Sequence, residues 1–244
     1  MIEIRGLRKR FGTVEAVRDV SFSASDGTVV GLLGPNGAGK TTTLRMLSGL
    51  MRPDAGTIRV DNADVAADPI GVQARMGHLP ESRGLYPRLT PIEHIEYFGR
   101  LHGLNGPALT ARANALVTRL GLNESADRPV SGFSQGERTK VALARALVHQ
   151  PRNVILDEPT NGLDVMSTRA MRDLIRGLRR DGCCVLFSSH IMQEVSALCD
   201  RIVVIAQGKV AADGTPDAIR NLTGRDNLED AFVALVGLEA EEIL

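Results

Sequence analysis

Short apolar runs that alternate with polar residues and turn signals occupy the first thirty residues. Residues 2–4 and 14–23 have this pattern, and they predict strands of an antiparallel sheet. Residues 28–33 form a denser apolar run, TVVGLL, which predicts a strand leading directly into a glycine-rich loop. We expect a helix after this loop that continues through residues 45–50, and then a further short strand at residues 57–60.

The pattern becomes helical between residues 91 and 147. Thr90 and Glu93 have the spacing of a capping box at the start of this region, so we expect a helix to begin directly after Thr90. Gly103 and Gly121 can adopt the left-handed conformation that ends helices. The sequence therefore predicts several successive helices here.

Strand patterns return at residues 153–156, 183–187 and 202–206, separated by helical stretches of the length found in βαβ units. We therefore expect an α/β core into which a helical lobe is inserted. The predicted units are one domain over residues 1–222, in which residues 1–84 and 153–222 form the core with its N-terminal β subdomain and residues 85–152 form the helical subdomain, and a short C-terminal helical extension over residues 223–244. Apolar residues at helical spacing predict that this extension packs on the protein's own surface instead of regulating activity; they are Leu228, Ala231, Phe232, Leu235 and Val236.

Composition narrows the class of protein. The 244 residues are 43% hydrophobic, which is enough for one large core or a core with a smaller lobe. The 29 basic and 29 acidic residues cancel, so we expect no nucleic-acid partner. Three cysteines are an odd number, and Cys183 and Cys184 lie together in an apolar run, which indicates buried strand residues in a reducing compartment. The longest apolar runs fall far below the roughly 18 residues of a membrane span, and the start of the chain has no signal-peptide pattern, so we expect a soluble protein.

The glycine-rich loop reads GPNGAGKT over residues 34–41 and matches the pattern of a phosphate-binding loop. Its glycines allow consecutive backbone N–H groups to turn toward phosphate oxygens, and Lys40 adds a positive charge. Thr41 offers a hydroxyl to Mg²⁺, and the helix beginning near Lys40 directs its positive end toward the anion. A purely structural turn is the alternative, which the flanking strand and helix disfavour. The expected phosphate-binding residues are Gly34, Asn36, Gly37, Ala38, Gly39, Lys40, Thr41 and Thr42.

Residues 154–158 read VILDE, an apolar strand that ends in two carboxylates. Acidic residues at the carboxyl end of a parallel strand face the ligand crevice of such sheets. In this Walker B pattern Asp157 holds Mg²⁺ and Glu158 orients or deprotonates the attacking water. A strand end with a helix-capping acid is the alternative, and the phosphate-binding loop makes it the weaker one. No Asn-Lys-x-Asp guanine motif appears, which disfavours a GTPase.

Three further segments resemble one family. Residues 133–147, FSQGERTKVALARAL, are similar to the signature motif of the ATP-binding-cassette (ABC) ATPases, although Ser134 and Glu137 by themselves indicate only a well-capped helix. The segment LDEPTNGLD at residues 156–164 resembles the family's Walker B and D-loop, and SSH at residues 188–190 resembles its switch histidine. The resemblance covers nearly the whole chain. Within the family, the chain resembles the ATPase subunits of bacterial two-component exporters, such as sodium-extruding ones.

The resemblance implies a P-loop NTPase (RecA-like) core with an antiparallel β subdomain and an inserted α-helical subdomain. It also implies that two cassettes pair head to tail, so that Ser134 and Gly136 of one copy reach the γ-phosphate bound by the other. Asp164 matches the D-loop aspartate that communicates between the two sites, and His190 matches the histidine that contacts the γ-phosphate. Phe11 matches the aromatic residue that stacks on adenine, the alternative being an ordinary core position in the sheet.

Two departures from the family pattern stand out. Gln135 and Glu137 replace a glycine and a glutamine of the usual signature LSGGQ, which puts the affinity across the dimer interface in question. Glu81 aligns with the stretch in which the family has a glutamine that bridges Mg²⁺, the attacking water and the helical lobe. Its carboxylate could ligate the metal, and its charge would couple to Glu158.

We therefore expect an ATPase with ATP and Mg²⁺ as cofactors, dimerising with itself or a homologous ATPase subunit. It would drive a separate integral-membrane permease, an exporter, from the cytoplasmic face of the cell membrane. The alternative from another class is a soluble non-transport ABC ATPase that acts on a macromolecular complex, and a regulatory ATP-binding module is a third reading. The substrate stays open among sodium, a drug, a lipid and a polysaccharide. Tyr86, in a turn after Glu81, is the residue we expect at the permease-docking surface, whereas one of Tyr97 and Phe98 packs the helical lobe.

Overall fold

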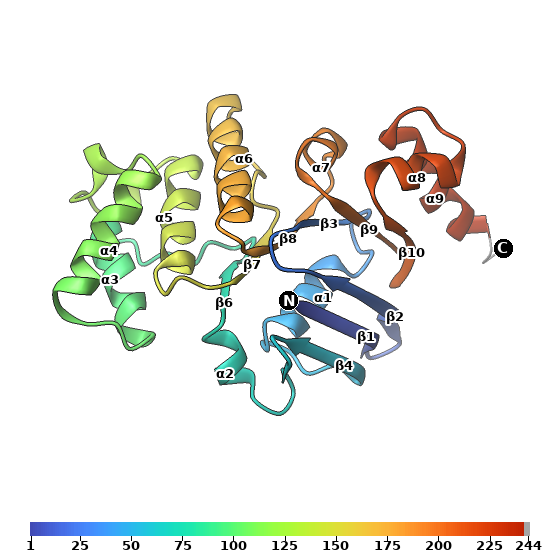
Figure 1. The fold of residues 1–244 in the computed structure, drawn as a ribbon, viewed down its shortest axis with the longest axis horizontal. Helices are drawn as coiled ribbons and strands as arrows, with labels where there is room; N and C mark the ends of the chain where they lie inside the picture. Colours follow the sequence, from blue (N-terminus) through green and yellow to red (C-terminus); the bar gives the residue numbers. More distant parts are fainter. Residues whose placement is uncertain (242–244) are drawn as a thin grey trace.

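A single twisted sheet runs through the molecule and carries both the predicted core and its N-terminal subdomain (Figure 1). The computed structural model describes residues 1–241. Its ten strands lie in the order β5-β4-β1-β2-β10-β9-β3-β8-β7-β6. The antiparallel part comprises β1 (Ile2–Phe11), β2 (Val14–Ala24), β4 (Ala55–Val60) and β5 (Ala63–Asp64). The parallel part comprises β3 (Val29–Leu33), β6 (Met76–Leu79), β7 (Asn153–Asp157), β8 (Cys184–Ser189) and β9 (Arg201–Ala206), and β10 (Lys209–Gly214) joins the two parts.

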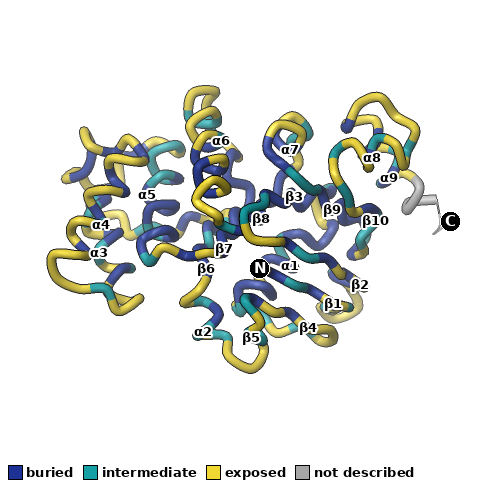
Figure 2. Tube along the Cα trace, viewed as in Figure 1, coloured by how far each residue is buried: buried dark blue, intermediate teal, exposed yellow. Residues whose placement is uncertain are grey.

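The parallel strands are buried on both faces, as Figure 2 shows for the centre of the molecule. Successive side chains of a strand point to opposite faces. In β7, Val154 and Leu156 accordingly join the core cluster beneath the later helices, while Ile155 joins the cluster around α1 (Lys40–Leu47). Helices cover both faces, which explains why these strands read as nearly continuous apolar runs.

Three helices form a separate lobe that the sequence places between β6 and β7 (Figure 1, green to yellow). They are α3 (Pro91–Leu101), α4 (Gly106–Arg119) and α5 (Gln135–Leu147). The predicted capping box is present: the Glu93 N–H donates to Thr90 Oγ1 at 3.2 Å, and Glu93 Oε2 accepts from the Thr90 N–H at 2.8 Å. Gly103 (φ +80°) and Gly121 (φ +63°) follow the first two helices, which confirms the predicted ends.

Three details differ from the sequence expectation. The helix after the glycine-rich loop ends at Leu47 and does not continue to residue 50, because Gly49 turns the chain at φ +66°. Strand β4 begins at Ala55, two residues early, because Ala55 pairs with Arg8 of β1. Cys184 is a buried strand residue as expected, but Cys183 precedes β8 and is only half-buried.

The remaining helices lie along the second half of the chain, apart from α2 (Pro69–Gln73) near β5. They are α6 (Val165–Arg180), α7 (Met192–Leu198), α8 (Pro216–Thr223) and α9 (Leu228–Glu241). Leu228, Ala231 and Leu235 of α9 are buried, which confirms that the C-terminal segment packs on the protein's own surface. Residues 242–244 of the predicted extension lie outside the described part. Among the described helices, none is long and apolar enough to cross a bilayer.

Candidate active site

The loop between β3 and α1 is built on glycines at positions that exclude side chains. Gly39 has φ +105°, and a Cβ there would lie 2.5 Å from the carbonyl oxygen of Ala16. A Cβ at Gly34 would lie 2.2 Å from the carbonyl oxygen of Ile205. The loop therefore passes closer to its neighbouring strands than any residue with a side chain would allow.

Lys40 is the first residue of α1, and its ammonium group lies over the loop. It is buried, and Nζ donates to the carbonyl oxygens of Gly34 (2.7 Å) and Pro35 (3.1 Å). Burial lowers the pKa of Lys40, and the carboxylates of Glu158, Asp157 and Glu81 oppose this shift. The cation therefore lies within the electrostatic reach of all three acids.

The start of α1 is open to an anion. No side chain caps this helix, and its first turn contains no acidic residue. Its first backbone N–H groups are thus available, with the positive end of the helix dipole behind them. Thr41 and Thr42 are half-buried in this turn, Ala38 is buried beside it, and Asn36 and Gly37 are exposed at the loop tip.

Adjacent strands bring the acids to the same edge of the sheet. Strands β3, β8 and β7 are neighbours and parallel, so the loop, His190 and the pair Asp157 and Glu158 all follow carboxyl ends. The Ser188 hydroxyl donates to Asp157 Oδ1 at 2.6 Å and accepts from the Glu158 N–H at 2.9 Å. His190 Nδ1 lies 3.0 Å from Glu158 Oε2.

Glu158 has an unusual backbone. Its φ is +47°, a left-handed conformation that side-chain-bearing residues adopt at some energetic cost, typically near functional sites. Its side chain is mostly buried, whereas that of His190 is 51% exposed. The carboxylate thus meets a histidine that faces solvent.

The predicted metal ligands suit a hard cation that is also held by phosphate. The Ser188 hydroxyl engages Oδ1 of Asp157, which leaves Oδ2 for a metal or its water. Thr41 lies in the first turn of α1, and Glu81 is exposed in the bend after β6. Within the described residues, no cluster of three or more His, Cys, Asp or Glu side chains could hold a metal alone. Mg²⁺ in nucleotide sites uses one or two protein oxygens, water and phosphate, so this donor set fits it.

The residues of the signature segment form a second, exposed group. Ser134 caps α5: its Oγ accepts from the Glu137 N–H at 3.2 Å, and Glu137 Oε2 accepts from the Ser134 N–H at 2.9 Å. Asp164 caps α6 through the N–H (2.8 Å) and hydroxyl (2.9 Å) of Ser167. A Cβ at Gly136 would lie 2.8 Å from Ser167 Oγ, so the starts of α5 and α6 are neighbours.

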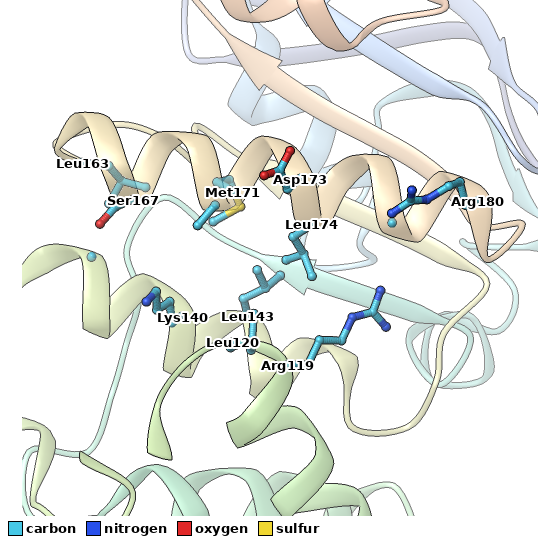
Figure 3. Close-up of a pocket in the computed structure, with 13 residues that line it drawn as sticks. Arg119, Leu120, Lys140, Leu143, Leu163, Ser167, Met171, Asp173, Leu174 and Arg180 are labelled. Atoms are coloured by element: carbon cyan, nitrogen blue, oxygen red, sulfur yellow. The ribbon is translucent and has the colours of Figure 1, made fainter. Parts of the chain in front are cut away.

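Beyond this point of approach, α5 and α6 separate. Figure 3 shows the cleft between them, with Ser167, Met171 and Leu174 of α6 on one side and Lys140 and Leu143 of α5 on the other. Its volume is about 370 Å³. Over part of their length the two helices therefore do not pack against each other.

Phe11 lies at the end of β1, outside the core. Its side chain is 47% exposed, and Lys9 Nζ lies 5.7 Å from the ring centroid. The ring is therefore free to stack on a planar ligand. No hydrogen bond or ion pair in the described chain joins it to the groups at the strand ends.

Sequence reasoning missed two buried charges beside the site. Arg83 donates to the backbone carbonyl of Glu158, and Glu194 of α7 is 2% exposed and accepts from the hydroxyl of Thr160. Arg172 of α6 lies 3.8 Å from Glu194. The sequence gives no signal for either, because each is an ordinary charged residue in a polar segment.

Comparisons with known proteins agree on one family. A profile described as "ABC transporter" matches residues 17–161. The "ABC transporter ATP-binding protein NatA" of Bacillus subtilis is 44% identical over 239 residues, covering 96% of this chain and 97% of that protein. The "Nod factor export ATP-binding protein I" of Burkholderia lata is 41% identical over 89% of this chain and 72% of that protein.

Solved structures give the same result. A structure described as the "ATP binding subunit of ABC transporter" has a TM-score of 0.89 at 31% identity, covering 96% of this chain and 99% of that one. The dimeric cassette MJ0796, bound to ADP and Pi, has a TM-score of 0.81 at 24% identity over 88% of this chain and 98% of that one, a likeness of fold.

Proposed function

Because the chain belongs to the ABC transporter family, we propose that it is an ATP-binding and ATP-hydrolysing subunit that pairs with a second cassette and drives a separate membrane-embedded permease. The observation that carries this proposal is the grouping of Lys40, Asp157, Glu158 and His190 at the carboxyl ends of adjacent parallel strands. We take residues 1–222 as the ABC domain, with the helical subdomain at 85–152 and the C-terminal extension from residue 223.

In this proposal the loop N–H groups and Lys40 bind the β- and γ-phosphates of ATP, and Phe11 stacks on the adenine. Thr41 and Asp157 would hold Mg²⁺, which would supply positive charge to neutralise the phosphate oxygens. Glu158 orients and deprotonates the attacking water, and His190, at 3.0 Å from Glu158, holds the carboxylate while its exposed face meets the γ-phosphate. Catalysis here is mainly positioning and electrostatic stabilisation.

A second cassette would complete the site. Ser134, Gly136 and Asp164 gather on an exposed surface, and Val165 and Met166 beside Asp164 are 83% and 73% exposed. Large apolar side chains that protrude together are typical of an interface. The helix start at Ser134, with its N–H groups, suits the γ-phosphate held by the other copy.

In this proposal the permease docks in a groove between the core and the helical lobe. A groove of about 560 Å³ is lined by apolar residues that include Leu50, Ile70, Phe98 and Leu101, and by polar residues that include Arg145 and three histidines. Tyr86 is 49% exposed at the lobe's edge, with its ring 5.8 Å from that of Tyr97. The relative named for Nod factor export favours an exporter, with this subunit acting from the cytoplasmic face of the membrane.

The experiment that tests this function replaces the proposed base. Glu158→Gln should bind ATP with Mg²⁺ as wild type does but lower turnover by about 10²–10⁴-fold, because the water loses its base while Lys40 still grips the phosphates. The variant should therefore accumulate as an ATP-bound dimer in gel filtration. Lys40→Ala is the matched control, which should lose nucleotide binding and remain monomeric. A monomeric Glu158→Gln protein, or turnover within about threefold of wild type, would contradict the proposal.

A further inference from the structure

Arg83 is a buried cation between the core and the helical lobe. Its side chain is 8% exposed, and all three guanidinium nitrogens donate: Nε to Thr139 Oγ1 (3.2 Å), Nη1 to Pro80 O (2.7 Å) and Nη2 to Glu158 O (3.2 Å). An apolar side chain of similar size would fill this space without the cost of burying a charge. The three directed hydrogen bonds therefore indicate a role other than packing.

The acceptors of Arg83 lie on different elements of the fold. Thr139 is on α5, whereas Glu158 directly follows β7. Gly136, one turn before Thr139, lies against Ser167 of α6, and a cleft of about 370 Å³ separates the two helices beyond that point (Figure 3). Arg145 of α5 also holds the backbone of the Arg83 segment, donating to the Arg83 carbonyl at 2.8 Å. Arg83 is thus attached to α5 through both its backbone and its side chain.

The backbone of Glu158 is fixed on both sides. Its N–H donates to Ser188 Oγ, and its carbonyl oxygen accepts from Arg83 Nη2 and from the Asn161 N–H at 3.3 Å. At φ +47° the residue depends on such bonds to keep its conformation. The direction of this backbone sets where the carboxylate meets His190.

We propose that Arg83 is a positioning residue that couples the location of α5 to the orientation of Glu158. This inference rests on the proposed function, in which Glu158 activates water. Because α5 also presents Ser134 and Gly136 to the nucleotide of the second cassette, Arg83 connects the two ATP sites of the dimer. When α5 contacts the nucleotide held by the second cassette, Arg83 transmits this contact to Glu158 in its own cassette's site.

The test combines variants of Arg83 and of Thr139, its hydrogen-bond acceptor on α5. Arg83→Gln should lower kcat for ATP hydrolysis by about tenfold while KM for ATP stays within about twofold, because the phosphate loop is untouched. Arg83→Lys, which keeps the charge and one or two of the bonds, should recover part of kcat. Thr139→Val should lower kcat and Thr139→Ser should restore it. The double variant Arg83→Gln/Thr139→Val should be no slower than Arg83→Gln, because both changes break one link.

A second measurement does not depend on turnover. Hydrogen exchange of the amides in residues 158–164 should speed up in Arg83→Gln and in Thr139→Val without nucleotide. Arg112→Gln is the matched control, since Arg112 also donates to carbonyl oxygens at the end of α5, Leu147 (3.0 Å) and Val148 (3.3 Å), but does not contact Glu158. It should leave kcat and this exchange unchanged.

Three results would overturn the inference: additive losses in the double variant, a fall of kcat that parallels a loss of melting temperature and ATP affinity, or unchanged exchange in residues 158–164. If Arg83→Gln fails to fold, the Thr139 pair and its exchange decide the matter. A wild-type protein no more active than Lys40→Ala would instead refute the proposed function, and this inference with it.

Discussion

His78 of β6 should make the protein sensitive to mild acid. Its imidazole faces the groove between core and lobe, and Nε2 is buried without a hydrogen-bond partner. Burial lowers the pKa of His78 to about 4 from a usual value near 6.5; Arg145 and Arg45 add to this shift, and Asp157 opposes it. The folded protein therefore keeps this imidazole neutral.

The sign of the effect follows from proton binding. Between about pH 6.5 and pH 4 the unfolded chain binds a proton at His78 that the folded protein does not. The stabilisation is fully present above the unfolded pKa and is lost as the pH falls toward the folded value. Between about pH 7.5 and pH 5, a pKa difference of this size lowers the free energy of unfolding by about 2 kcal/mol. For a chain of this length, that corresponds to a fall of roughly 4–8 °C in melting temperature.

The perturbation is His78→Leu, which removes both the titration and the unsatisfied nitrogen. We expect urea unfolding, monitored by circular dichroism at constant ionic strength, to give the free energy of unfolding at pH 7.5 and at pH 5. The decrease in this free energy between the two pH values should be about 2 kcal/mol smaller in His78→Leu than in wild type. The difference between the two proteins cancels the contribution of the carboxylates. Equal losses in both proteins, within about 0.5 kcal/mol, would refute a buried neutral imidazole at this position.

Three more predictions concern the proposed nucleotide and docking surfaces. Ser134→Arg should leave ATP binding by the monomer within about twofold of wild type and lower dimer-dependent hydrolysis at least tenfold. Lys40→Ala should instead lose nucleotide affinity. If equilibrium titration shows that both variants lose ATP affinity equally, Ser134 has no role across the interface. Glu81→Gln should change the Mg²⁺ requirement or the pH profile of hydrolysis, because it removes a charge that acts on Lys40. Identical Mg²⁺ and pH profiles for the variant and wild type would show that Glu81 has no role in hydrolysis. Tyr86→Ala should keep basal hydrolysis but lower recovery of the permease from detergent extracts by about tenfold. Tyr97→Phe is the control, and unchanged recovery of the permease with Tyr86→Ala would exclude Tyr86 from docking.

Local sequence determined most of the secondary structure, because the signals act within a few residues. The glycine-rich loop, the capping boxes at Thr90 and Ser134, and the carboxylates after the VILD strand each specify their own geometry through short-range sterics and hydrogen bonds. The family motifs also indicated which strand ends would meet. The sequence thus predicted the α/β core, the inserted helical lobe and the gathering of Lys40, Glu158 and His190.

Tertiary structure alone decided the features that depend on distant partners. Strand β4 begins at Ala55 because a bulged β1 offers Arg8 as a partner across the sheet. Arg83 acquires its three acceptors only when β6, β7 and α5 come together, and nothing in its neighbouring sequence distinguishes it from a solvated arginine. The same holds for His78, whose shifted pKa results from burial in a groove between two units. Burial and long-range hydrogen bonds arise from packing, and a local pattern does not encode them.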